Sequence, residues 1–264
     1  MPVFRTLTVF VLLCFCQPLT AELVTQELTY RHGDTEMRGM IAYDSASKEP
    51  RPGILVVHEW WGQNEYPRER ARQLAAMGYT ALAVDMYGDG KTATHPDKAG
   101  EFAGAVGGNL PLAKARFEAA LAALREQPTV LDDQIAAIGY CFGGGVVINM
   151  ARLGIDIDGV VSYHGSLATS SPAQPGDVAP RVLVFNGAAD PLVTAEQIDA
   201  FKTEMDAAGA DYEFVNYPGA LHGFTNPGAD EKGKTFGLPL AYDAAADEDS
   251  WTRTQAFFDA IFSE

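Results

Sequence analysis

Short apolar runs alternate with amphipathic segments along the chain, and this alternation predicts an α/β fold. The runs are rich in Val, Ile and Ala, which is typical of strands buried on both faces of a parallel sheet. They lie at residues 53–57, 80–84, 135–138, 160–163, 182–185 and 212–217. Ahead of them, residues 23–31 and 36–43 flank a His32-Gly33-Asp34 turn and predict an opening β-hairpin.

Helical patterns fill the gaps between these strands. Apolar residues three and four positions apart between Phe117 and Leu124 predict a helix that begins near Pro111. Thr194 and Gln197 form a capping-box pattern at the start of another helix, and a last apolar stripe predicts a helix at the C-terminal end. Strands that alternate with helices over this length predict a doubly wound, mostly parallel sheet with helices on both faces.

The first 21 residues have the layout of a secretory signal peptide. Arg5 is the only charged residue before Glu22, a short apolar run follows it, and Leu19-Thr20-Ala21 ends on a small residue. The run is too short to span a bilayer comfortably. We therefore expect residues 1–21 to be removed, residues 22–264 to form a single domain, and the mature protein to be exported, periplasmic or secreted, without stable membrane insertion.

Charge and cysteine content narrow the possible functions. The chain of 264 residues carries 19 Lys and Arg against 35 Asp and Glu, a net charge of -16. This balance disfavours nucleic acid and anionic membrane surfaces, because both attract basic proteins. Cys14 and Cys16 leave with the signal peptide, so the mature chain keeps only Cys141 and has no internal disulfide. The oligomeric state is not indicated by any sequence feature.

The run Gly139-Tyr140-Cys141-Phe142-Gly143 follows a predicted strand and opens a predicted helix. It matches the G-x-S-x-G nucleophile elbow with cysteine at the centre. Such a turn exposes the sulfur above the sheet and at a helix N-terminus, where the helix dipole favours a thiolate. The alternative is a buried cysteine at a tight junction between strand and helix. The pattern is not G-x-G-x-x-G, so no dinucleotide cofactor is expected.

A carboxylate and a histidine follow later strands in the order that this elbow requires. Asp190 comes after the strand at 182–185, and His222 comes after the strand at 212–217, between Leu221 and Gly223. Singly, Asp190 could cap a turn and His222 could be a surface residue. Together with Cys141 they predict a catalytic triad at the carboxyl edge of the sheet.

The loop after the strand at 53–57 reads His58-Glu59-Trp60-Trp61-Gly62. It opens like a zinc motif, but position 62 is glycine, so H-E-x-x-H fails and no metal is expected. In an elbow hydrolase this loop supplies one of the two amides that bind the oxyanion. We expect Trp60 to provide that amide and Phe142 to provide the other.

These motifs together resemble the dienelactone hydrolase family of α/β-hydrolases over roughly residues 23–264. The resemblance implies an α/β-hydrolase fold, no cofactor, and cleavage of a small ester or lactone through a Cys141–His222–Asp190 triad and a thioester. It also implies that Glu59 contacts the resting thiol and helps to deprotonate it. An exported enzyme would benefit, because a protonated thiol resists oxidation.

Other residues near the expected site bear on the substrate. Trp61, Tyr87 and Phe224 fall in loops close to it and are candidates for substrate binding. Relatives that act on carboxylated dienelactone are expected to hold its carboxylate with arginines, at positions that are Asp89 and Asn226 here. The sequence therefore favours neutral esters or lactones.

Two other classes of function remain open at this stage. A non-catalytic ligand-binding protein can share this fold, because a fold alone does not imply turnover. A thiol redox protein could use Cys141, although it would need a partner thiol. The complete set of Cys141, Asp190 and His222 favours the hydrolase.

Overall fold

The computed structural model describes residues 22–263, so the predicted signal peptide lies outside the described residues. An eight-stranded sheet runs through the domain in the order β1-β2-β4-β3-β5-β6-β7-β8. The strands are β1 (Leu23–His32), β2 (Thr35–Asp44), β3 (Arg51–Val57), β4 (Thr80–Val84), β5 (Val130–Tyr140), β6 (Gly159–Tyr163), β7 (Arg181–Gly187) and β8 (Tyr212–Tyr217). From β4 to β8 all neighbours pair in parallel, whereas β1, β2 and β4 pair antiparallel.

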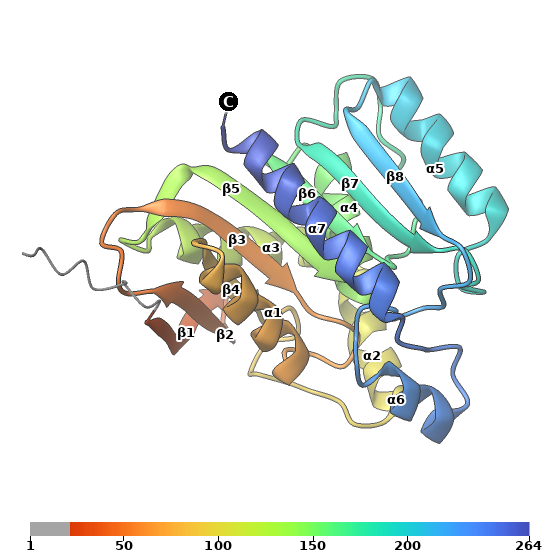
Figure 1. Cartoon of the computed structure of the whole chain (residues 1–264), viewed down its shortest axis with the longest axis horizontal. Coiled ribbons are helices and arrows are strands. Elements are labelled where there is room, and N and C mark those ends of the chain that lie inside the picture. Colours follow the sequence, from red (N-terminus) through yellow and green to blue (C-terminus); the bar gives the residue numbers. More distant parts are fainter. Residues whose placement is uncertain (1–21, 264) are drawn as a thin grey trace, which may run out of the picture.

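Helices cover both faces of this sheet, which confirms the doubly wound fold expected from the sequence (Figure 1). They are α1 (Glu65–Ala76), α2 (Pro96–Gly107), α3 (Leu110–Arg125), α4 (Phe142–Arg152), α5 (Ala195–Ala208), α6 (Ala229–Phe236) and α7 (Ala244–Ile261). The buried side chains of α1 and α7 pack on one face of the sheet, and those of α3, α4 and α5 pack on the other.

Most helices and strands begin or end where the local sequence signals predict. The capping box of Thr194 and Gln197 starts α5, and the opening hairpin turns at Gly33, whose φ is 56°. The strand predicted at 135–138 is longer, because Val130 and Leu131 also pair with β3 before a register shift at Pro52/Gly53. Helix α6 divides the long segment 219–241, which the sequence left as a loop.

The carboxyl ends of the parallel strands all point to one edge of the sheet, where α2 and α6 lie beyond them (Figure 1). The two helices meet through His95 and Phe236, whose ring centroids are 5.4 Å apart. The loops after β3, β4, β5, β6, β7 and β8 therefore converge here. Within the described residues, no helix is long and apolar enough to cross a membrane.

Candidate active site

Cys141 stands between β5 and α4 in a backbone conformation that non-glycine residues seldom adopt, with φ of 54° and ψ of -113°. The turn needs glycine on both sides. A Cβ on Gly139 would collide with the carbonyl of Gly143, and a Cβ on Gly143 would collide with the carbonyl of Val57. The G-x-C-x-G spacing therefore has a steric cause, and the strain it permits is typical of functional turns.

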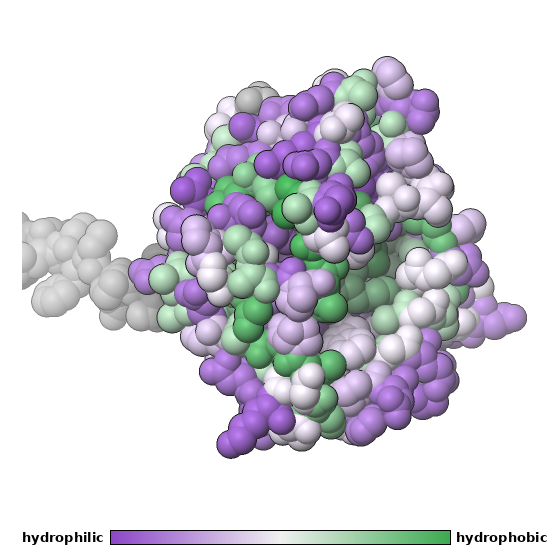
Figure 2. Space-filling model, turned by 90° about the vertical axis from the view of Figure 1, so that its right-hand side faces the viewer, coloured by the Kyte–Doolittle hydropathy of each residue, from purple (hydrophilic) through white to green (hydrophobic). Residues whose placement is uncertain are grey.

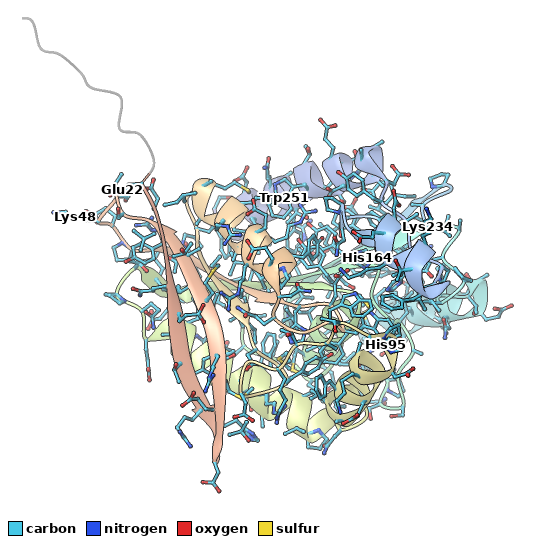
Figure 3. All side chains as sticks on the ribbon, turned by 90° about the horizontal axis from the view of Figure 1, so that it is seen from below. Glu22, Lys48, His95, His164, Lys234 and Trp251 are labelled. Carbon is cyan, nitrogen blue, oxygen red and sulfur yellow. The ribbon has the colours of Figure 1, made fainter. Side chains whose placement is uncertain are left out.

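His164 stabilises this strained turn through a hydrogen bond to the backbone of Cys141. Its own φ is 41°, and it lies in the interior of the molecule (Figure 3). The Cys141 N–H donates to the carbonyl of Tyr163 (3.0 Å) and to His164 Nδ1 (3.1 Å), while His164 Nε2 lies 2.9 Å from Thr225 Oγ1. Burial and the neighbouring His222 hold the pKa of His164 well below its usual range, so the ring is neutral and can accept. His164 therefore holds the backbone of Cys141 in place.

Asp190 and His222 meet across the ends of β7 and β8. His222 Nδ1 lies 2.7 Å from Asp190 Oδ2, and the other carboxylate oxygen accepts from the Leu192 N–H at 2.8 Å. The Asp190 side chain is wholly buried, so the pair is shielded from water. This leaves His222 Nε2, on the wall of the same cavity as Cys141, without a hydrogen-bond partner among the described residues.

The charge state of His222 depends on its two neighbours, Cys141 and Asp190. Burial lowers the pKa of the imidazole, but the Cys141 sulfur and the Asp190 carboxylate outweigh it and raise the pKa to about 10. A neutral sulfur would remove much of this effect.

Phe142 and Trp60, the two residues expected to supply oxyanion-binding amides, line the same cavity as Cys141. Among the described residues, neither the Phe142 nor the Trp60 N–H donates a hydrogen bond. The two loops are held together because Gly143 N–H donates to the carbonyl of His58 at 3.1 Å, and Tyr87 Oη donates to the carbonyl of Trp60 at 2.9 Å. These hydrogen bonds hold the backbone around both amides in place.

His58 also holds these loops in place, and it does not line the cavity. Its Nδ1 lies 2.6 Å from the Glu59 carbonyl, and its Nε2 accepts from the Met86 N–H at 3.2 Å. Burial lowers the pKa of His58 to about 4, so the ring is neutral. Among residues 22–263, no group of three or more His, Cys, Asp or Glu side chains could hold a metal ion.

Glu59 makes a different contact from the one that the family resemblance implies. Its Oε2 accepts from Asn226 Nδ2 at 2.7 Å, and no hydrogen bond joins it to Cys141 in the described part of the chain. Burial raises the pKa of Glu59, while Asn226, Lys232 and His222 oppose that rise. Asn226 was expected near the pocket rim. It is instead buried, because its amide partners the Glu59 carboxylate.

A cavity of about 480 Å³ opens beside Cys141 and His222. On the face to which the strand ends point, Figure 2 shows a hollow surrounded by hydrophobic residues. The remaining wall residues come from α2, the start of α4 and several loops, and are Trp60, Ala103, Phe142, Ser166, Leu192, Val193, Leu238, Pro239 and Leu240. The segment 238–241 is tied to the histidine, since the Ala241 N–H donates to the His222 carbonyl at 3.2 Å.

Three aromatic residues suggested as substrate contacts lie elsewhere. Trp61 is buried against Trp60 and Phe236, Tyr87 is buried with its hydroxyl on the Trp60 carbonyl, and Phe224 is fully buried beside His164. None of the three lines the cavity. Residue type and loop position could not reveal this, because the loops fold their large rings inward.

No Arg or Lys among the described residues lines the cavity. Asp89, expected near the rim, is exposed and pairs with Lys91 at 2.9 Å instead. Arg51 donates to the carbonyls of Asp44 and Ser47, and Arg68 pairs with Glu27. Arg51, Arg68 and Lys91 are therefore engaged away from the cavity.

The fold and this arrangement define the class as α/β hydrolase. An α/β hydrolase from a deep-sea metagenome library superimposes with a TM-score of 0.65 at 17% identity, covering 93% of this chain and all of that one. The sequence model of the dienelactone hydrolase family matches residues 37–262, and the chain belongs to that family.

Two relatives illustrate the match. A dienelactone hydrolase-like promiscuous phosphotriesterase from metagenomic libraries is 34% identical, with a TM-score of 0.85 over 92% of this chain and 99% of that one. A protein of Methylorubrum extorquens named "Putative carboxymethylenebutenolidase" is 31% identical over 79% of this chain and 72% of its own length. The chain is thus an ester or lactone hydrolase by family.

Proposed function

We propose that the protein hydrolyses neutral carboxylic esters or lactones with Cys141 as nucleophile. The observation that carries this is one cavity whose wall includes both Cys141 and the His222 that is paired with Asp190, together with Trp60 and Phe142. Neither a ligand-binding protein nor a redox protein requires all of these parts. A panel of esters and lactones tested with wild type and Cys141→Ala distinguishes the three functions.

Acylation uses the anionic sulfur and the protonated histidine. The Cys141 thiolate attacks the carbonyl carbon, and the N–H groups of Phe142 and Trp60 bind the resulting oxyanion, each worth about 3 kcal/mol. Collapse breaks the bond between carbon and the alkoxide oxygen. His222 Nε2 gives its proton to the departing alkoxide, while Asp190 holds Nδ1–H and fixes the tautomer.

Deacylation follows from the change of charge at sulfur. In the thioester the sulfur is neutral, so the interaction that raises the His222 pKa is lost and the imidazole becomes a base. It removes a proton from water, the hydroxide attacks the thioester carbon, and the thiolate leaves. The returning charge at sulfur restores the ion pair with His222.

The residues of the cavity wall favour substrates without a negative charge. Among the described residues no Arg or Lys lines the wall, so a buried substrate carboxylate would have no guanidinium or ammonium partner there, which costs several kcal/mol. We expect kcat/KM for a neutral lactone to exceed that for a carboxylated lactone of the same ring size by at least about tenfold. A preference for the carboxylated lactone would mean that an arginine reaches the substrate.

Glu59 is proposed to tune the thiol from its buried position. Because the buried Glu59 interacts electrostatically with His222 and accepts from Asn226, we expect Glu59→Gln to slow turnover and to change the rate of Cys141 alkylation by iodoacetamide. Glu65→Gln, at an exposed site on α1, is the matched control. If both rates in Glu59→Gln equal those of wild type, Glu59 has only a packing role.

We also propose that the protein is exported. The support is the signal-like layout of residues 1–21, with a single charge, an apolar run and a small residue at Ala21. We expect mass spectrometry of the native protein to find a chain that begins near Glu22, outside the cytoplasm. An intact Met1 on a cytoplasmic species would rule out cleavage.

A further inference from the structure

A second cavity, of about 190 Å³, adjoins the one that holds Cys141 and His222. Phe142 and Ser166 belong to the walls of both, so they stand between the two spaces. The second cavity lies between the first turns of α4, the junction of α2 and α3, and the loop after β6. Leu110, Val146 and Met150 supply apolar wall, Asn149 and Ser166 are polar, and no charged side chain of the described residues lines it.

The two cavities differ in their relation to His222. The larger one includes His222 and the segment 238–240, whereas no residue from 219–241 lines the smaller one. His222 protonates the departing alkoxide, so the alcohol part of the substrate must lie on the His222 side. The acyl part must then extend away from it, past Phe142 and along α4.

Two glycines keep the second cavity open although their backbones do not require glycine. Neither Gly107 nor Gly145 has a positive φ. A Cβ on Gly145 would make ordinary contact with Ser166 at 3.5 Å, and a Cβ on Gly107 would lie 3.4 Å from the Phe142 ring. Both lie in helices, where glycine is destabilising relative to alanine. The structural reason for glycine here is the space that a side chain would fill.

We propose that this second cavity binds the acyl chain and that the substrates are neutral esters with an unbranched aliphatic acyl group. This inference rests on the proposed function. The volume equals that of about six water molecules, which suits a chain of about four to eight carbons. Each methylene that the wall removes from water is expected to raise kcat/KM about fourfold until the space is full.

The test uses 4-nitrophenyl esters with acyl chains from acetate to octanoate, all with the same leaving group. In wild type, kcat/KM is expected to rise with chain length to about hexanoate. Gly107→Leu fills the cavity and is expected to lower the ratio of hexanoate to acetate by at least about tenfold. Gly104→Leu is the matched control, because it lies on the same helix with no atom within 4 Å of its Cβ, and its ratio should equal that of wild type.

A second series fixes the orientation of the substrate. Acetate esters with alcohol chains of increasing length should respond equally in wild type and Gly107→Leu. A flat acyl series in wild type, an unchanged ratio in Gly107→Leu, or a loss confined to the alcohol series would each overturn the acyl cavity while acetate turnover persists. Failure to turn over any ester, acetate included, would overturn the proposed function itself and this inference with it.

Discussion

Cys141→Ala is expected to lower kcat for ester hydrolysis by at least about four orders of magnitude. The sulfur is the nucleophile of the proposed mechanism, and Cys141 lines the same cavity as His222, Phe142 and Trp60. Alanine keeps the Cβ and the strained backbone, so the thermal midpoint should stay within a few degrees of wild type. Steady-state kinetics on a 4-nitrophenyl ester, with circular dichroism melts alongside, measures both.

Cys141→Ser tests whether the nucleophile must be a sulfur atom. A hydroxyl is far less acidic than a thiol and would not carry the charge that keeps His222 protonated, so at most weak activity is expected. If the alanine variant keeps its turnover, the cysteine mechanism is wrong. A folded but inactive alanine variant agrees with it.

The second large loss of activity is expected from substitutions in the Asp190–His222 pair. His222→Ala removes the one histidine ring among the described residues that line the cavity, and Asp190→Asn turns an amide donor toward His222 Nδ1 and selects the wrong tautomer. Each change should lower kcat by several orders of magnitude, with a smaller loss for Asp190→Asn. In that variant the Asn oxygen can still accept from the Leu192 N–H, so the loop should stay in place.

Asp89→Asn is the matched control for the aspartate. Asp89 is an exposed carboxylate in another loop at the same edge, and its φ of 57° suits asparagine. Activity in Asp89→Asn should equal that of wild type. If Asp190→Asn behaves like this control, another carboxylate orients the histidine.

The parts of the molecule that depend on local rules could be predicted from the sequence. Buried runs gave the parallel strands, and the spacing of Gly139 and Gly143 around Cys141 predicted the elbow because sterics demand it. Asp190 and His222 each follow a strand, and parallel strands end at one edge, so their meeting could also be predicted.

The parts of the molecule that depend on contacts between distant segments could not be predicted from the sequence. Asn226 partners Glu59 across 167 residues, a pairing that no spacing rule indicates. The cavity wall at Leu238, Pro239 and Leu240 depends on α6 folding the 219–241 segment back over His222. Likewise, whether Trp61 turns inward or toward the substrate is decided by its packing on Phe236.

The central claim is that a thioester forms at Cys141. Rapid-quench mass spectrometry after mixing the enzyme with an activated ester measures this directly. We predict a transient mass increase equal to the acyl group, located by peptide mapping on the fragment that contains Cys141, and formed and lost at rates consistent with turnover. Turnover without any acylated species under single-turnover conditions, or acylation at a residue other than Cys141, would contradict the account.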